Sequence, residues 1–234
     1  MSEKHPLILV PGLLCTAELW RDQAQALSDI ADIHIPTHHL DNNIEAIADR
    51  ILRAAPDQFA LAGLSMGGYV ALEIILRAPE RVTHLALMDT RADADTEQDK
   101  KKRQDFINLV ERGRVFKGVT ESLLPMLIHP SRFKDNALTS RIYQMAEDIG
   151  KDGFIQQEIA IMNRKDRWAE LSQIDCPTLV LSGNEDALIP APNQQKMAEA
   201  IPDAEFHIIP ECGHLPSMER PFETNTIMRE WLSW

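Results

Sequence analysis

Disulfide-forming cysteines, long apolar runs and an excess of basic residues are all missing from this sequence. Its three cysteines, Cys15, Cys176 and Cys212, are an odd number, so they predict no closed disulfide framework and favour a reducing cytoplasm. No apolar stretch approaches the roughly 20 residues that span a bilayer, and Pro11-Gly12 interrupts the apolar run near the amino terminus. We therefore expect neither a membrane span nor a cleaved leader.

The balance of charge excludes further classes of protein. Lys and Arg total 24 against 36 Asp and Glu, which gives a formal net charge of −12. An acidic surface repels both nucleic acid and anionic membranes. The basic run Lys100-Lys101-Lys102-Arg103 is an exception, but its acidic neighbours predict a solvated helix surface. The expected partner is a small-molecule substrate, with no nucleic acid or membrane partner, and the expected assembly is a monomer or a homodimer.

Short apolar runs alternate with amphipathic segments along most of the chain. At 234 residues, 44% of them hydrophobic, the chain is long enough for one sizeable core. The alternation predicts a parallel, doubly wound sheet with helices on both faces. The expected strands are residues 7–10, 30–35, 59–62, 81–89, 176–183 and 205–209. Expected helices begin at Thr16 and near Glu219 and cover 41–55 and 69–76, and the last one should face inward with Phe222, Met228, Trp231 and Leu232.

The alternation breaks between residues 92 and 170, where no convincing strand occurs. Glycines and prolines divide this stretch into helical segments rich in charge. Apolar faces within it should bury against the core or line a pocket: Phe106, Leu109 and Val110, then Leu123, Leu124, Met126 and Leu127, then Ile142, Met145 and Ile149. We therefore predict a core of residues 1–91 and 171–234 with a helical insertion of residues 92–170.

The sequence Gly63-Leu64-Ser65-Met66-Gly67-Gly68 joins one expected strand to one expected helix. A strand, a sharp turn and a helix therefore meet at Ser65, whose side chain should project from the carboxyl edge of the sheet. The glycines admit a backbone that a Cβ would obstruct, and the helix points free N–H groups at whatever the serine attacks. The G-x-S-x-G pattern alone also fits an ordinary turn, so it needs support from the rest of the chain.

That support comes from two loops that follow later strands. A serine hydroxyl is a poor nucleophile near neutral pH and needs a base that a third group orients. Asp186 follows the strand that ends at Gly183, and His214 follows the last strand. Because parallel strands end at one edge, Ser65, Asp186 and His214 should converge as nucleophile, acid and base.

The serine turn and the chain order Ser65, Asp186, His214 resemble the α/β-hydrolase superfamily, in particular its capped serine esterases and enol-lactonases. The resemblance implies a doubly wound, mostly parallel sheet in which residues 92–170 form a helical cap. It also implies that the amino-terminal hairpin of many relatives is missing here. It favours Asp186 over Glu185 as the acid, while Asp89 stays an alternative because some relatives place the acid there.

The same resemblance implies an oxyanion hole made by the backbone N–H groups of Met66 and Leu13. Relatives usually have His-Gly at the turn after the first strand, whereas this chain has Pro11-Gly12. A main-chain donor survives that replacement, but the position of the second donor is left open.

The expected chemistry is the hydrolysis of carboxylic esters through an acyl-enzyme on Ser65. The alternatives are hydrolysis of enol-lactones, thioesters or carbon–carbon bonds, or a slow-turnover small-molecule receptor on the same fold. Leu14, Leu188 and Leu215 are apolar and predict a pocket for uncharged or weakly polar acyl groups of small to medium size.

Two further side-chain groups have competing interpretations. Arg91 could pair with a substrate carboxylate or form a salt bridge with Asp93 or Asp95 at the start of the insertion. His38 and His39 could suggest a metal site, but no cysteine or carboxylate recurs near them at ligand spacing. We expect no metal and no cofactor.

Overall fold

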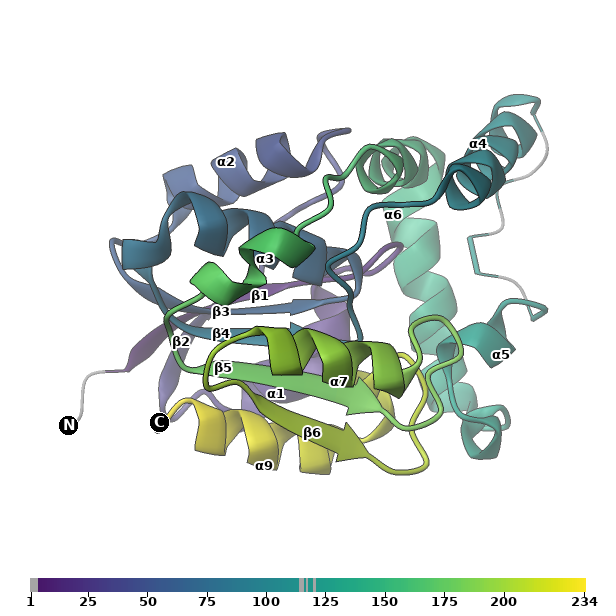
Figure 1. The fold of residues 1–234 in the computed structure, drawn as a ribbon. Coiled ribbons are helices and arrows are strands. Elements are labelled where there is room, and N and C mark those ends of the chain that lie inside the picture. Colours follow the sequence, from purple (N-terminus) through teal and green to yellow (C-terminus); the bar gives the residue numbers. More distant parts are fainter. Residues whose placement is uncertain (1–3, 114–115, 117, 120) are drawn as a thin grey trace.

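The computed structural model describes residues 4–113, 116, 118–119 and 121–234. At its centre is a six-stranded sheet in the order β2-β1-β3-β4-β5-β6, in which every neighbouring pair is parallel. The carboxyl ends of the strands therefore share one edge (Figure 1). This confirms the predicted parallel, doubly wound sheet. The strands are β1 (His5–Val10), β2 (Ala31–His34), β3 (Phe59–Leu64), β4 (Val82–Met88), β5 (Thr178–Gly183) and β6 (Glu205–Ile209).

Apolar side chains of the central strands alternate between two faces. In β1, Leu7 and Leu9 belong to one apolar cluster, while Ile8 and Val10 belong to the other. Every residue of β3 and of β5 is buried, which explains why these strands read as continuous apolar runs. The edge strands β2 and β6 keep exposed residues on their outer sides.

Helices cover both faces of the sheet. One face packs against α2 (Ile44–Ala54), α3 (Met66–Arg77) and α7 (Ala191–Ala200), and the other against η1 (Ala17–Trp20), α1 (Arg21–Ala26) and α9 (Pro221–Trp231). The short helices η2 (Pro79–Arg81) and α8 (Pro216–Glu219) precede β4 and α9. None of the helices in the described part of the chain is long and apolar enough to cross a lipid bilayer.

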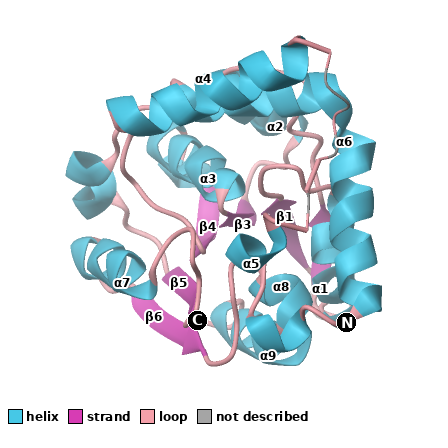
Figure 2. Cartoon of the chain, turned by 90° about the vertical axis from the view of Figure 1, so that its right-hand side faces the viewer, coloured by secondary structure: helices cyan, strands magenta, loops and turns pink. Residues whose placement is uncertain are grey.

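The helices between β4 and β5 lie beyond the carboxyl ends of the strands. They are α4 (Glu97–Glu111), α5 (Leu124–Leu127), η3 (Pro130–Arg132), α6 (Asn136–Met162) and η4 (Trp168–Gln173), with no strand among the described residues. Figure 1 shows α4, α5 and α6 past the arrowheads of the strands, and Figure 2, which looks onto that edge, shows α4 and α6 framing it. Gly150 breaks α6 with φ 68° and ψ −178°. We refer to residues 92–170 as the helical insertion, and its boundaries remain a prediction.

The expected inward side of the last helix is wrong at one residue. Phe222 is 80% exposed, whereas Met228 and Trp231 are buried. The buried residues follow Phe222 by six and nine positions, which places them on the other side of a helix with 3.6 residues per turn. Phe106 and Leu109 are also exposed, at 49% and 43%, so the described part of α4 buries only Ile107 fully.

Candidate active site

Ser65 occupies a sharp turn between β3 and α3. Its φ of 55° and ψ of −116° are unusual for a residue with a side chain. Close packing explains the glycines around it, because a Cβ on Gly63 would lie 2.1 Å from the Gly67 carbonyl oxygen. A Cβ on Gly67 would in turn lie 2.1 Å from the carbonyl oxygen of Val10. The predicted glycine requirement is therefore a matter of backbone contact between β1, β3 and α3.

The end of β4 holds this turn in place. The Ser65 backbone N–H donates to the Met88 carbonyl at 2.9 Å, and the Thr90 hydroxyl donates to the Ser65 carbonyl at 2.8 Å. Thr90 is fully buried and lies close to Gly68. A Cβ added to Gly68 would be 2.3 Å from the Thr90 hydroxyl oxygen. The serine backbone is thus fixed from both the β1 and the β4 side.

Asp186 and His214 meet at the same sheet edge. His214 Nδ1 lies 2.8 Å from Asp186 Oδ2, and both residues are buried. The other carboxylate oxygen accepts the backbone N–H groups of Leu188 and Ile189 at 2.8 and 3.0 Å. Burial alone would raise the pKa of Asp186, but His214 and the two N–H groups hold it below its ordinary value. The ionised carboxylate therefore accepts from Nδ1–H and leaves His214 Nε2 available as a base.

Ser65 and His214 do not share a hydrogen bond in this structure, and the serine hydroxyl bonds to no other described residue. Catalytic hydrogen bonds of this kind are often long without a substrate and shorten when it binds. Ser65 remains partly accessible, whereas His214 is buried.

Glu219 organises the loop that carries His214, and the sequence did not indicate this role. Its carboxylate accepts the backbone N–H groups of Gly213 at 3.0 Å, Leu215 at 3.2 Å and His129 at 2.6 Å. Burial raises its pKa although these donors act in the opposite direction. One carboxylate therefore fixes the backbone on both sides of His214 and ties it to the helical insertion.

Gln194 in α7 links the β4 and β5 loops and was also missed. It is fully buried, accepts the Thr90 N–H at 3.3 Å and donates to the Ser182 hydroxyl at 2.8 Å and the Ile189 carbonyl at 2.9 Å. The loop after β4 and the loop of Asp186 are thus held by one side chain. A glutamine in an otherwise ordinary amphipathic helix gives no sequence signal for such a role.

Asp89 is a second buried carboxyl beside Asp186. Its Oδ1 accepts the Gly183 N–H at 2.9 Å, and no described residue donates a hydrogen bond to its buried Oδ2. Burial and the charge of Asp186 raise the pKa of Asp89 well above its ordinary value. Asp89 is therefore the carboxyl of the pair that takes up a proton more readily, and Asp186 is the one that bonds to His214.

Asp89, Asp186 and His214 each offer one possible ligand atom, and these atoms lie within 4.8 Å of one another. Two backbone N–H groups and Nδ1 already occupy both oxygens of Asp186. A metal would have to displace these donors, so the arrangement fits a hydrogen-bonded acid–base pair better than a cation site.

Two backbone N–H groups point to an oxyanion hole beside Ser65. Met66 is the first residue of α3, so its N–H has no acceptor within the helix. The Leu13 N–H likewise has no acceptor among the described residues. The turn that carries it touches the serine, because a Cβ on Gly12 would lie 3.3 Å from the Leu64 oxygen and 3.4 Å from Ser65 Cβ.

The predicted pocket residues differ in exposure. Leu14 and Leu215 are buried at 9% and 2% exposure, whereas Leu188 is 44% exposed. Arg91 donates to Asp95 at 2.9 Å, which is the salt bridge that the sequence offered as one of its two interpretations.

Asp95 gathers three arginines where the insertion leaves the core. Besides Arg91, it contacts Arg103 and Arg164, each at 2.5 Å, and Arg103 also contacts Glu158 at 2.7 Å. The Asp95 side chain is fully buried. The expectation of a solvated basic run is therefore wrong at Arg103, because this residue turns inward to two buried carboxylates.

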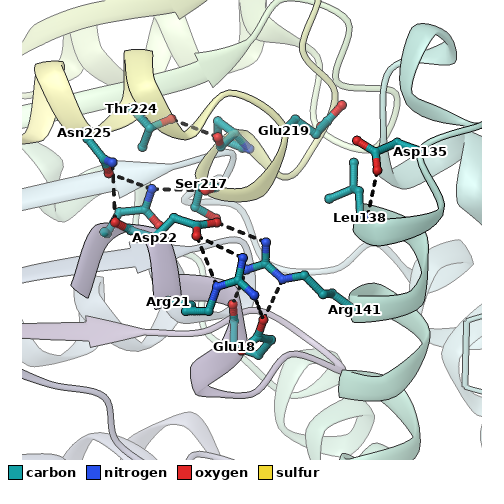
Figure 3. Close-up of polar contacts among 12 residues, drawn as sticks. Glu18, Arg21, Asp22, Asp135, Leu138, Arg141, Ser217, Glu219, Thr224 and Asn225 are labelled. Atoms are coloured by element: carbon teal, nitrogen blue, oxygen red, sulfur yellow. Dashed lines mark hydrogen bonds and ion pairs between the residues drawn. The ribbon is translucent and has the colours of Figure 1, made fainter. Parts of the chain in front are cut away.

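A second ionic contact holds the other half of α6. Arg141 donates to Glu18 at 2.6 Å and to Asp22 at 3.0 Å, as Figure 3 shows. Arg21 reaches the same two carboxylates from the solvent side. Arg141 thus anchors the first half of α6 to the core, whereas the Asp95 cluster ties the second half of α6 to the start of the insertion and to Arg91.

Comparisons with known proteins agree on one group. A family model described as the alpha/beta hydrolase fold matches residues 37–221. The pimeloyl-[acyl-carrier protein] methyl ester esterase of Nitrosomonas europaea is 27% identical over 237 residues, covering 92% of this chain and 90% of that protein. A thermophilic esterase from Thermogutta terrifontis is 30% identical with a TM-score of 0.89, covering 98% of this chain and 89% of its own. The enol-lactonase from Burkholderia xenovorans LB400 shares the fold at a TM-score of 0.86 and 20% identity. The match covers 99% of this chain and 93% of the enol-lactonase chain.

Proposed function

The chain belongs to the α/β-hydrolase fold family, as the sequence predicts, and we propose that it is a serine hydrolase of carboxylic esters. The observation that carries this proposal is the buried 2.8 Å hydrogen bond between His214 and Asp186, on loops at the sheet edge that also presents the strained Ser65. The proposed substrates are esters of small to medium, mainly apolar acyl groups.

In the proposed mechanism, the Ser65 hydroxyl oxygen attacks the ester carbonyl carbon while His214 Nε2 removes its proton. The protonated imidazole then gives this proton to the leaving alcohol as the carbon–oxygen bond breaks, which leaves the acyl group on Ser65. A water molecule, deprotonated by the same nitrogen, releases the acid. Asp186 holds Nδ1–H throughout and stabilises the positive charge that forms on His214.

The negative charge that develops on the carbonyl oxygen requires donors that are in place beforehand. The N–H groups of Met66 and Leu13 are assigned this role, because neither is used by another described residue and both adjoin Ser65.

Cysteine chemistry is a poor alternative at this site. Burial raises the pKa of Cys15 to about 12, and burial together with Glu219 raises the pKa of Cys212. Both thiols therefore stay protonated near neutral pH, and neither residue has the strained backbone of Ser65. Three unpaired thiols also fit the proposed reducing, cytoplasmic setting of the protein.

Arg91 bears on the proposed acyl group. Arg91 donates to Asp95 through Nη2, which favours the salt bridge over recognition of a substrate carboxylate, and the buried Leu14 and Leu215 favour apolar groups. Two of the relatives are named esterases, which fits an ester substrate, while the third acts on an enol-lactone by its name. A panel of neutral esters, matched acid-bearing esters and enol-lactones separates these classes.

The test is covalent labelling with a fluorophosphonate, followed by mass mapping of the labelled peptide and by turnover on the ester panel. We expect labelling at Ser65, none in Ser65→Ala, and no change in the surface control Ser28→Ala. Ester turnover in Ser65→Ala should fall by roughly 10⁴-fold or more. Labelling that persists in Ser65→Ala would refute the assignment, and tight ligand binding without turnover would favour a receptor.

A further inference from the structure

Gln157 reaches from the helical insertion to the turn after β1. It is fully buried in the second half of α6, and its Oε1 accepts the Leu14 N–H at 3.0 Å across 143 positions of the chain. Its Nε2 lies 2.9 Å from Nε2 of His38, which is also buried. Both polar ends of this side chain are therefore used at the edge of the sheet that carries Ser65.

The Leu14 N–H decides how this group of residues is bonded. It needs an acceptor, which fixes the Gln157 amide with its oxygen toward Leu14 and an N–H toward His38. His38 Nε2 must then accept, so His38 is neutral with its proton on Nδ1. Burial agrees with this assignment, since it lowers the pKa of His38 to about 4. The Gly12 carbonyl lies 3.0 Å from the same nitrogen and also accepts the Cys15 N–H at 3.1 Å.

The hydrogen bond from the Leu14 N–H to Gln157 is made by a strained turn. Leu14 has φ 59°, a left-handed conformation that is unfavourable for a residue with a side chain. The turn is closed by only one backbone bond of its own, from Cys15 to Gly12. Without the Gln157 acceptor, a buried N–H would be unsatisfied and the turn could relax toward an unstrained conformation. The neighbouring Leu13 N–H would then lose its position beside Ser65.

We propose that Gln157 is a positioning residue for the oxyanion hole: it fixes the turn of residues 12–15 so that the Leu13 N–H faces the developing oxyanion. This role rests on the proposed ester hydrolysis by Ser65. Gln157 contacts neither the ester nor the reacting atoms, and it acts through Leu14. The oxyanion hole is therefore complete only when the second half of α6 lies on the core.

The experiment compares three variants with the intact protein on a p-nitrophenyl ester. Gln157→Leu removes the acceptor at similar size, and Gln157→Glu keeps an acceptor for Leu14 and, as a buried neutral acid, a donor for His38. Gln156→Leu is the matched control one position away. We expect Gln157→Leu to lower kcat by about 10- to 100-fold with KM within about threefold, since oxyanion donors act on the transition state. Gln157→Glu and Gln156→Leu should stay within about fivefold of the wild-type kcat.

A transition-state analogue separates positioning from a merely structural role. An alkyl trifluoromethyl ketone forms a tetrahedral oxyanion on the serine, so its inhibition constant should rise in Gln157→Leu by the same factor as kcat falls. The carboxylic acid product should bind unchanged. If Gln157→Leu does not fold, Gln157→Met replaces it. The kcat and the ketone inhibition constant of Gln157→Met are then compared with those of Gln157→Glu to test the positioning role.

Three results would overturn the role of Gln157: an unchanged kcat in Gln157→Leu, an equal loss in Gln157→Glu or Gln156→Leu, or product binding that weakens as much as ketone binding. Ser65→Ala is measured in the same assay. If Ser65→Ala loses turnover and Gln157→Leu keeps the wild-type turnover, only the positioning role is overturned. Turnover that survives in Ser65→Ala overturns the proposed function itself.

Discussion

The sheet edge and the helical insertion are held in place by different kinds of interaction. At the sheet edge, backbone N–H groups fix the reactive side chains: Leu188 and Ile189 donate to Asp186, and the Ser65 N–H donates to Met88. In the insertion, side-chain ion pairs are prominent: Asp95 binds three arginines, and Arg141 binds Glu18 and Asp22.

This difference sets what each region is sensitive to. Backbone hydrogen bonds between adjoining loops respond little to salt, whereas ion pairs weaken with ionic strength wherever solvent reaches them. We therefore expect substitutions at the sheet edge to change chemistry and substitutions in the ionic anchors to change stability.

The largest expected effect separates the two carboxyls at the sheet edge. Asp186→Asn should lower kcat by roughly 10⁴-fold, because His214 loses the carboxylate that selects its tautomer. Asp89→Asn should lower it by less than about tenfold, since an amide oxygen still accepts the Gly183 N–H and replaces a carboxyl whose pKa is raised by burial. Steady-state kinetics on one ester measures both. Equal losses, or a reversed order, would make Asp89 the acid that orients His214.

The next effect falls on the buried anchor of the insertion. Asp95→Asn leaves three arginines without their shared counter-charge and should lower the free energy of unfolding by about 3–5 kcal/mol. Urea unfolding measures this change, with Asp105→Asn on the exposed side of α4 as the control. A loss as small as that of the control would show that the arginines find other partners.

His38 provides a pH-dependent effect of about 3 kcal/mol. Its pKa falls from 6.5 to about 4 on burial, so the folded protein binds fewer protons than the unfolded chain. Stability should therefore decrease as pH falls from about 6.5 toward about 4, and each pKa unit contributes about 1.4 kcal/mol. His38→Gln should remove this dependence, while the exposed His34→Gln should keep it. Parallel pH curves for wild type and His38→Gln would contradict the buried, neutral state.

The smallest effect belongs to the solvent-facing anchor in Figure 3. Arg141→Met should lower the free energy of unfolding by about 1 kcal/mol, and about 1 M NaCl should reduce the difference. Arg21→Met is the matched control, because Arg21 binds the same carboxylates but is 53% exposed. An effect of Arg141→Met that is independent of salt would mean that its packing, not its charge, holds α6.

The sequence predicted the sheet edge well because its signals are local. Ser65, Asp186 and His214 each follow a strand within a few residues, and glycines mark the turn that Ser65 requires. Strand order then brings these loops together without further information. The fold class could be predicted for the same reason, since alternation of strands and helices is visible in short windows.

The residues that hold the site were not predictable, because their partners are distant in the chain. Gln157 binds a backbone group 143 positions away, and Gln194 binds Thr90 across 104 positions. Arg103 read as part of a solvated run because its two acidic partners become buried only when α4 and α6 pack together. The face of α9 was misjudged at Phe222, because this residue lies on the other side of the helix from Met228 and Trp231.

Backbone strain is concentrated where the chemistry is proposed. Five non-glycine residues in the described part of the chain have positive φ, and four of them, Leu14, Ser65, Asp89 and Glu211, follow the carboxyl ends of β1, β3, β4 and β6. Each such residue costs about 1–3 kcal/mol. Glycine would relieve this strain at the exposed Glu211, but at Leu14 or Asp89 it would also delete a buried side chain. Variants at Leu14 and Asp89 should therefore lose both melting temperature and activity, so selection for heat resistance has few ways to relax this edge of the sheet.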